Sequence, residues 1–172
     1  MTRTLGRLAF FFLLSLTLVA CSKGGPPGTE EGAKQLLEAF LKPDADHAAL
    51  SKALRPTSAD YAAVYGKEMG EKLEKMYAAP WDAGQLVVKP NEGQTELKLF
   101  KATSEELKSG AENTKEFPGG YKKVAESLQG GQTLYRFKFV KPGADSGMAF
   151  DGLVHVNGHW VIMPKPWRAL SE

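Results

Sequence analysis

The sequence predicts an α+β fold in which N-terminal helices pack on a curved antiparallel sheet. Apolar residues recur with a period of about 3.6 between residues 33 and 77, which is typical of amphipathic helices. From residue 85 onward the period changes to two, as in half-buried strands. Asn157-Gly158, the strongest hairpin signal in the chain, separates the last two alternating segments. Helices followed by an antiparallel meander are expected to form two packed layers.

Two helices are predicted before residue 57. The first is indicated by apolar side chains at positions i, i+3, i+4, i+7 and i+8, namely Ala33, Leu36, Leu37, Phe40 and Leu41. Pro43 brings this helix to an end. Asp46 can cap a second, short helix, which ends at Pro56.

A third helix begins at a T-x-x-D capping pattern formed by Thr57 and Asp60. Its apolar stripe consists of Tyr61, Val64, Tyr65, Met69, Leu73, Met76 and Tyr77. We expect the helix to end before Pro80. Gly66 and Gly70 each weaken it by up to about 1 kcal/mol and indicate close packing or a kink. The stripe is expected to face the core.

The second half of the chain is predicted to form the sheet. The expected strands cover residues 86–89, 95–101, 133–140, 148–156 and 159–163. Between the second and third of these strands the chain is polar and rich in glycine, with short helices expected at residues 104–108 and 121–128.

The N-terminus has the pattern of a secretory signal. Arg3 and Arg7 supply positive charge, and a run of 13 uncharged residues follows from Leu8 to Ala20. A transmembrane helix needs about 20 apolar residues. The run is therefore too short to span a membrane, and a cleaved signal peptide is the better interpretation.

The segment Leu18-Val19-Ala20-Cys21 resembles the lipobox of bacterial lipoproteins, over the first 22 or so residues. The resemblance implies cleavage between Ala20 and Cys21, attachment of a diacylglycerol to the Cys21 thiol, and acylation of the new amine. Ser22 is similar to the sorting pattern that directs lipoproteins of enteric bacteria to the outer membrane. The resemblance thus implies a protein held in the bacterial envelope by lipid. An ordinary signal followed by an incidental thiol is the alternative.

The expected organisation has three parts. Residues 1–20 form the signal peptide, residues 21–29 the lipidated cysteine and a flexible Gly/Pro tether, and residues 30–172 a single α+β domain. Because the signal contains two of the 22 basic residues and none of the 20 acidic ones, the mature domain is balanced in charge. No basic patch with interleaved aromatic residues points to nucleic acid. Cys21 is the only cysteine, so no thiol is left for a disulfide, metal or redox site, and no cofactor is expected.

Two histidines near the hairpin suggest a metal site at first sight. His155 and His159 are four residues apart, but a two-residue turn pairs His155 with Trp160 and places His159 on the other face of the ribbon. A metal site is therefore not expected. Asp151 shares a strand face with His155 but lies about 13 Å away along an extended chain, too far for a catalytic dyad.

Aromatic residues suggest a ligand pocket. A cone-shaped sheet closed by helices often has a concave mouth, and we place Tyr61, Asp151, His155 and Trp160 there as candidate pocket residues. The alternative is that the aromatic residues form an ordinary core with satisfied polar tips.

Element order and the closing segment Gly158-His159-Trp160 are similar to those of NTF2-like and cystatin-like folds, over residues 30 to 168. The resemblance implies a cone-shaped sheet, as in small bacterial lipoproteins of this kind. We hypothesise a non-catalytic protein that binds a ligand or partner protein at the membrane surface through the open side of the sheet. The alternative is an NTF2-like enzyme that uses a buried Asp60, Asp151 or His155. A structural role in the envelope is a third possibility.

Overall fold

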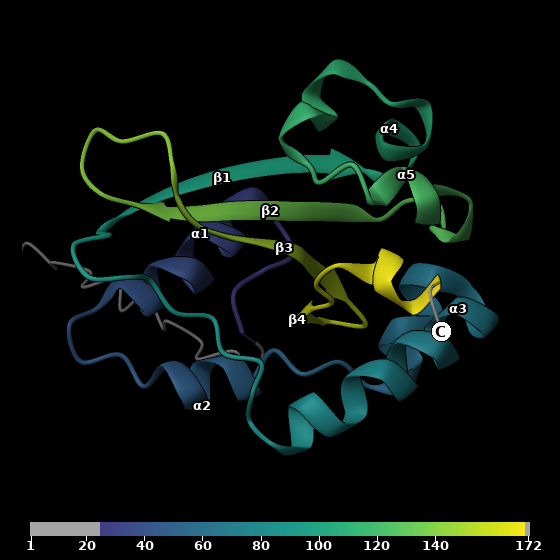
Figure 1. The fold of residues 1–172 in the computed structure, drawn as a ribbon, viewed down its shortest axis with the longest axis horizontal. Helices are drawn as coiled ribbons and strands as arrows, with labels where there is room; N and C mark the ends of the chain where they lie inside the picture. The colour runs from purple at the N-terminus through teal and green to yellow at the C-terminus, as the bar shows by residue number, and fades with distance from the viewer. Residues whose placement is uncertain (1–24, 171–172) are drawn as a thin grey trace, which may run out of the picture.

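Four antiparallel strands form one curved sheet in the computed structural model, which describes residues 25 to 170 (Figure 1). The strands are β1 (Glu96–Thr103), β2 (Thr133–Val140), β3 (Gly147–Val156) and β4 (His159–Ile162), in that spatial order. Five α-helices accompany them in the described residues, so the predicted α+β class is confirmed. The expected signal peptide, its cleavage site at Ala20 and the lipid site at Cys21 lie outside the described residues.

Strand β2 has the predicted bounds, and the hairpin between β3 and β4 turns at the predicted residues. Asn157 and Gly158 both have positive φ, 50° and 83°, which is the geometry of a two-residue hairpin turn. His155 pairs with Trp160 and Val156 with His159, so the predicted register is confirmed.

A β-bulge interrupts β3 at Gly152. Asp151 pairs with Arg136 and Leu153 pairs with Tyr135, which leaves Gly152 as the extra residue. Its φ is 80°, and a Cβ there would lie 2.1 Å from the Met163 carbonyl oxygen. Only glycine fits at this position.

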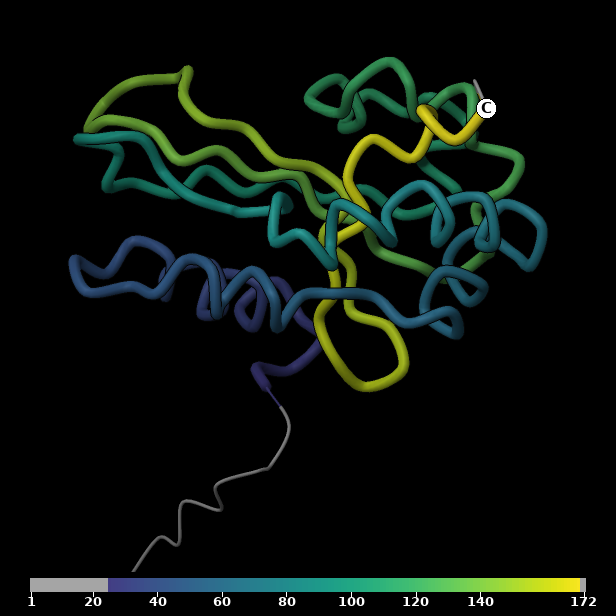
Figure 2. The backbone as a smooth tube through the Cα atoms, turned by 60° about the horizontal axis from the view of Figure 1, so that its bottom comes forward, coloured from purple at the N-terminus to yellow at the C-terminus, as the bar shows by residue number. Residues whose placement is uncertain are grey.

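The helices of the first half cover one face of the sheet (Figure 2). Helix α1 (Glu30–Glu38) continues as a 3₁₀ turn (Ala39–Leu41), and α2 (His47–Lys52) follows with Asp46 as its N-cap. Phe40 packs against Phe139 of β2, with ring centroids 6.4 Å apart. The three aromatic residues Tyr135, Phe137 and Phe139 of β2 are buried beneath this layer, as the alternation of the strand predicts.

Helix α3 (Ser58–Asp82) begins with the predicted capping box of Thr57 and Asp60. It bends at Gly66, where φ is 73° and ψ is 169°, so of the two alternatives expected for this glycine, close packing or a kink, the structure has the kink. A Cβ on Gly70 would lie 2.9 Å from the backbone nitrogen of Ala62, because the bend brings the two halves of the helix together.

The predicted end of α3 before Pro80 is wrong. The helix continues to Asp82, and hydrogen bonds from Ala83 N to Ala79 O and from Gln85 N to Pro80 O complete its last turn. Pro80 removes only its own backbone donor, and the extra turn buries Trp81 in the core.

The predicted strand at residues 86–89 is also wrong, because this segment pairs with no strand. The backbone N–H of Val88 donates instead to the Ser51 hydroxyl of α2, at 2.8 Å. The segment is therefore fixed to the helical layer rather than to the sheet.

Short helices cover part of the other face, near β1 and β2 (Figure 1). Helix α4 (Ser104–Ser109) has its own capping box of Thr103 and Glu106. Two 3₁₀ turns (Glu112–Glu116 and Ala125–Ser127) flank α5 (Tyr121–Val124), and a last 3₁₀ helix (Pro166–Leu170) packs against α5. The expected short helices at residues 104–108 and 121–128 are thus present.

Residues 26 to 29, expected as part of a flexible tether, lie against the domain. The indole nitrogen of Trp160 donates to the Pro26 carbonyl oxygen at 2.8 Å. A Cβ on Gly28 would meet the His155 ring at 2.3 Å, so glycine permits the close approach. Thr29 caps α1 by accepting from Gly32 N. Residues 21–24 of the expected tether lie outside the described residues.

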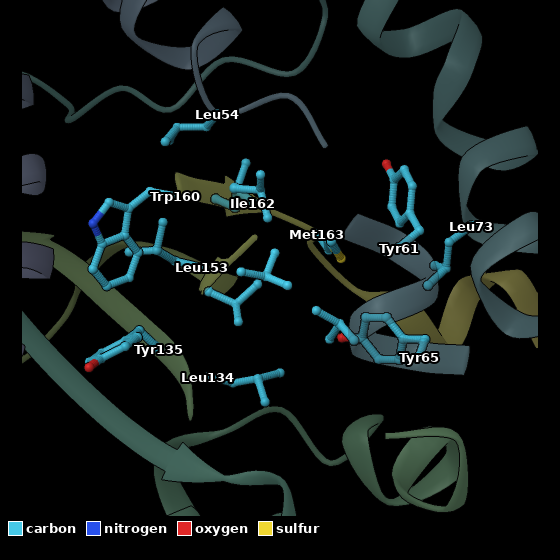
Figure 3. Packing of buried hydrophobic residues seen from close by; sticks show 14 of the residues in the cluster. Leu54, Tyr61, Tyr65, Leu73, Leu134, Tyr135, Leu153, Trp160, Ile162 and Met163 are labelled. Atoms are coloured by element: carbon cyan, nitrogen blue, oxygen red, sulfur yellow. The ribbon is translucent and has the colours of Figure 1, made fainter. Parts of the chain in front are cut away.

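One hydrophobic core joins the helices to the sheet. Side chains of the sheet, such as Leu153 and Trp160, meet those of α3, such as Tyr65 and Leu73, in a continuous buried cluster (Figure 3). Tyr61 is 2% exposed and Trp160 4%. The aromatic residues that we expected at a pocket mouth are therefore mainly core residues.

Candidate functional site

Half of β3 has a strand neighbour on one side only. Strand β4 pairs with Leu153–Val156, whereas Gly147–Asp151 pairs with β2 alone. We call residues Gly147–Asp151 the open edge. Within residues 25–170, no group hydrogen-bonds to the outward-facing backbone N–H and C=O groups of the open edge. Such unpaired backbone groups are a template for pairing with another chain.

A cleft of about 280 Å³ runs along the open edge, and we call it the β3 cleft. The unpaired segment at residues 85–88 forms its opposite wall. The lining is completed by Tyr77 of α3, by Ile162 at the end of β4, and by Pro164, Lys165 and Arg168 of the segment that follows β4. A hollow of about 460 Å³ that shares Val87, Met148 and Phe150 continues the cleft toward residues 89–92.

The rim of the β3 cleft is apolar and exposed. Val87 on one wall is 39% exposed and Met148 on the other is 36% exposed. Among the described residues, the one further large hydrophobic side chain with comparable exposure is Leu170, at 46%. Two exposed apolar residues facing one cleft indicate an interaction site more strongly than scattered ones.

Asp151 lies where the cleft meets the core. Its side chain is 5% exposed, and Oδ1 accepts hydrogen bonds from the Tyr121 hydroxyl at 3.1 Å and from the backbone N–H of Lys165 at 2.8 Å. Burial raises the pKa of the Asp151 carboxyl. Lys165 has φ of 48°, and the bond to Asp151 holds this left-handed residue in place. Asp151 thus fixes the turn that closes one end of the cleft.

Burial also raises the pKa values of the tyrosines in this region. It raises the pKa of Tyr61 to about 12, and it raises the pKa values of Tyr65, Tyr77 and Tyr121 above the ordinary range. The Tyr77 hydroxyl donates to the Pro164 carbonyl oxygen, whereas the hydroxyls of Tyr61 and Tyr65 have no hydrogen-bond partner within the described residues. These neutral phenols pack the core rather than supply a base.

His155 lies in the other half of β3, and Trp160 lies opposite it in β4. Their rings meet edge to face, with centroids 5.1 Å apart, beneath the segment at residues 26–29. Burial lowers the pKa of His155. These two residues therefore hold the N-terminal segment and do not line the β3 cleft.

Asp60 connects the start of α3 to the hairpin turn. Its Oδ2 accepts from Thr57 N at 2.8 Å and from His159 Nε2 at 3.1 Å, and its Oδ1 accepts from Asn157 Nδ2 at 2.8 Å. Burial opposes ionisation of Asp60, but the hydrogen bonds from Thr57 and Asn157 outweigh it and lower the pKa of the carboxyl. This acid is a structural connector.

The structure does not bring the four candidate pocket residues together. Asp151 lines the β3 cleft, Tyr61 lies in the core, and His155 and Trp160 hold the N-terminal segment. Sequence reasoning missed the cleft residues Val87, Met148, Lys165 and Arg168. One signal was available, because the strand predicted at residues 148–156 is longer than its hairpin partner at 159–163, which must leave part of it unpaired.

A second depression, of about 450 Å³, lies between α2 and the end of α3. Two of its four charged residues already pair with each other, since Arg55 Nη1 and Asp82 Oδ1 are 2.8 Å apart. It also lacks the unpaired strand backbone that marks the β3 cleft, which is therefore the stronger candidate site.

Comparison with protein-family models, with curated proteins and with solved structures gave no match. Among the helices of residues 25–170, none has both the length and the apolar character needed to cross a membrane. Nor do three or more metal-ligating side chains converge anywhere in this part of the chain.

Proposed function

We propose that this chain is a lipid-anchored protein of the bacterial envelope that binds a partner protein at the membrane surface, without catalysis, through the β3 cleft. The observation that supports this best is the open edge of β3 with Val87 and Met148 exposed on either side. Unpaired backbone and exposed apolar side chains in one place are what a protein partner covers. The lipobox resemblance at Cys21 supports the anchor and an outer-membrane location.

The titratable groups near the cleft favour binding over catalysis. Asp151 uses Oδ1 to hold Tyr121 and Lys165, and the other two candidate acid–base residues, Asp60 and His155, serve other contacts away from the cleft. General acid–base chemistry needs a partner within hydrogen-bond reach of the substrate. Among the three candidate acid–base residues, none is placed to act as a second group beside Asp151.

The N-terminal contact defines how the domain would face the membrane. Cys21 precedes Pro26 by five residues, which span at most about 17 Å. Because Pro26 is bonded to Trp160, a lipid on Cys21 would hold the hairpin end of β3 near the bilayer. Figure 2 shows the N-terminal segment beside that hairpin turn and the β2–β3 loop at the opposite end. The open edge would extend away from the bilayer, where a partner can reach it.

The anchor is tested by metabolic labelling with palmitate in the native host. The wild-type chain should incorporate label, and Cys21→Ala should not, with Ser22→Ala as the matched control. Incorporation that survives Cys21→Ala would refute the anchor.

The cleft is tested by photo-crosslinking in the same cells. A photoreactive phenylalanine analogue at position 87 should give a discrete protein adduct, and the same analogue at Leu170, which is equally exposed but outside the β3 cleft, should not. No adduct at position 87, or the same adducts at both positions, would contradict a binding role for the cleft.

A second candidate is an NTF2-like enzyme, favoured by one observation: a buried acid with a raised pKa lines the cleft. Asp151→Asn preserves the acceptor for Tyr121 and Lys165, so it should leave crosslinking at position 87 unchanged if the protein only binds. Conversion of a cleft-bound small molecule by the wild type but not by Asp151→Asn would establish the enzyme instead.

A further inference from the structure

We propose that the β3 cleft receives the C-terminal segment of a partner protein, which adds to the open edge as a strand and places its terminal carboxylate beside Lys165 and Arg168. This inference rests on the proposed binding function and names the chemistry of the partner. Three features of the cleft support it: its backbone, its walls and its closed end.

The backbone of the open edge can pair with an extended peptide. Alternate residues of the five-residue open edge direct their N–H and C=O groups outward, over about 17 Å, and an added strand satisfies them. The residues Gly147-Met148-Ala149-Phe150 contain no charge and no proline, the usual protections of a sheet edge. The outer edge of β1 is protected, since Lys98 and Lys101 form ion pairs with Asp145 and Glu30.

The walls of the cleft fit alternating apolar side chains. Met148 and Phe150 project from the same face of β3, two residues apart, and Val87 lies on the opposite wall. An added strand presents every second side chain to one face, so two apolar residues of the peptide would contact Met148 and Phe150.

One end of the cleft is closed by the chain itself. The backbone N–H of Met163 donates to Gly152 O at 2.9 Å, so Met163 takes the pairing position that follows Asp151. A bound strand must therefore stop at Asp151. A peptide that ends inside the cleft places one of its termini there. The charge of the side chains at the closed end decides whether that terminus is the amine or the carboxylate.

Two cations line this closed end. Lys165 and Arg168 border the cleft, and within residues 25–170 neither has a carboxylate within 4.0 Å. The nearby acid, Asp151, directs Oδ1 to Tyr121 and to the Lys165 N–H. A terminal carboxylate is complementary to two unpaired cations, whereas a terminal amine is not. The bound strand would run parallel to β3.

The test uses the full-length lipoprotein in detergent and two pools of random N-acetylated hexapeptides, one with free C-terminal carboxylates and one amidated. Affinity selection with mass spectrometry should enrich peptides from the free-acid pool. The best of these, resynthesised as the amide, should bind at least tenfold more weakly. Lys165→Ala/Arg168→Ala should produce the same loss for the free acid, and Lys122→Ala/Lys123→Ala on α5 should not.

Hydrogen exchange on the complex provides the second readout. Amides at alternate positions of Gly147–Asp151 should become protected when the peptide binds, and Met148→Lys should abolish both binding and protection without lowering the melting temperature. Equal binding of acid and amide, protection elsewhere, or no enrichment from either pool would overturn the inference. A position-87 adduct in cells that persists after such a result would leave the proposed binding function intact and refute only the C-terminal strand.

Discussion

The two halves of β3 are both mainly apolar, but their surroundings differ. Leu153–Val156 pairs with β4, with Leu153 and Val154 paired with β2 as well, and is largely buried, whereas Gly147–Asp151 has β2 on one side and the β3 cleft on the other. The difference originates in β4, which is shorter than β3 because Pro164 and Pro166 follow it and proline cannot continue a ladder. A length mismatch within one hairpin is thus enough to leave half of β3 unpaired on one side.

The largest expected effect is the difference in stability between a substitution in the buried half of β3, Leu153–Val156, and one in the open edge. Leu153 is fully buried, so Leu153→Ala should lower the free energy of unfolding by about 2–5 kcal/mol. Met148 is 36% exposed, and Met148→Ala should cost less than about 1 kcal/mol. Urea denaturation of both variants measures this, and equal losses would contradict the distinction between the halves.

The boundary between the halves depends on Gly152. Gly152→Ala introduces a Cβ 2.1 Å from the Met163 carbonyl oxygen at a φ of 80°, and it should cost about 3 kcal/mol. Gly143 also has positive φ, 73°, but has open space around it, so Gly143→Ala should cost only about 1 kcal/mol. Thermal denaturation distinguishes the two variants. A melting temperature of Gly152→Ala that is no lower than that of Gly143→Ala would contradict the steric argument.

The two buried acids near β3, Asp60 of α3 beside the hairpin turn and Asp151 in the open edge, should respond oppositely to pH. The pKa of Asp60 is lowered on folding from an ordinary value of 3.8, so its ionised form stabilises the protein above that pH, and the contribution is lost as pH falls. Asp60→Asn should therefore cost about 1–3 kcal/mol at pH 7 and less toward pH 3.

The pKa of Asp151 is raised from the same ordinary value, so its ionisation lowers stability as pH rises through the folded pKa. Asp151→Asn should gain stability relative to the wild type between pH 4 and pH 7. The free energy of unfolding of the two variants, relative to the wild type, is measured against pH. Slopes of the same sign for the two variants would refute the prediction of opposite responses.

The smallest effect concerns the segment at residues 26–29, which is held by a hydrogen bond from Trp160 of β4. Trp160→Phe removes the donor to Pro26 O, and the loss of this hydrogen bond should contribute about 1 kcal/mol to the cost of the substitution. The amide of Thr29, which donates to Pro27 O at 2.8 Å, should then exchange faster. Unchanged exchange at Thr29 would mean that other contacts hold this segment.

Local patterns predicted most of the elements, and long-range contacts account for the failures. Capping residues, the kink at Gly66 and the Asn157-Gly158 turn are encoded within a few residues, and all of them are present. The segment at residues 86–89 has the composition of a strand, but its position is decided by Ser51, which is distant in sequence. The candidate site was predicted only at Asp151, because the β3 cleft is formed by the lengths of two strands and by residues 85–88 and 162–168 together.

The exposure of Met148 also has a chemical consequence. Of the methionines in the described part of the chain, Met69 and Met163 are buried and Met76 is half-buried, whereas Met148 stands open to solvent. An oxidant would convert its thioether to a sulfoxide first, which places a polar oxygen on the apolar rim. A single oxygen atom could in this way weaken partner binding reversibly, while the core and its melting behaviour stay unaltered.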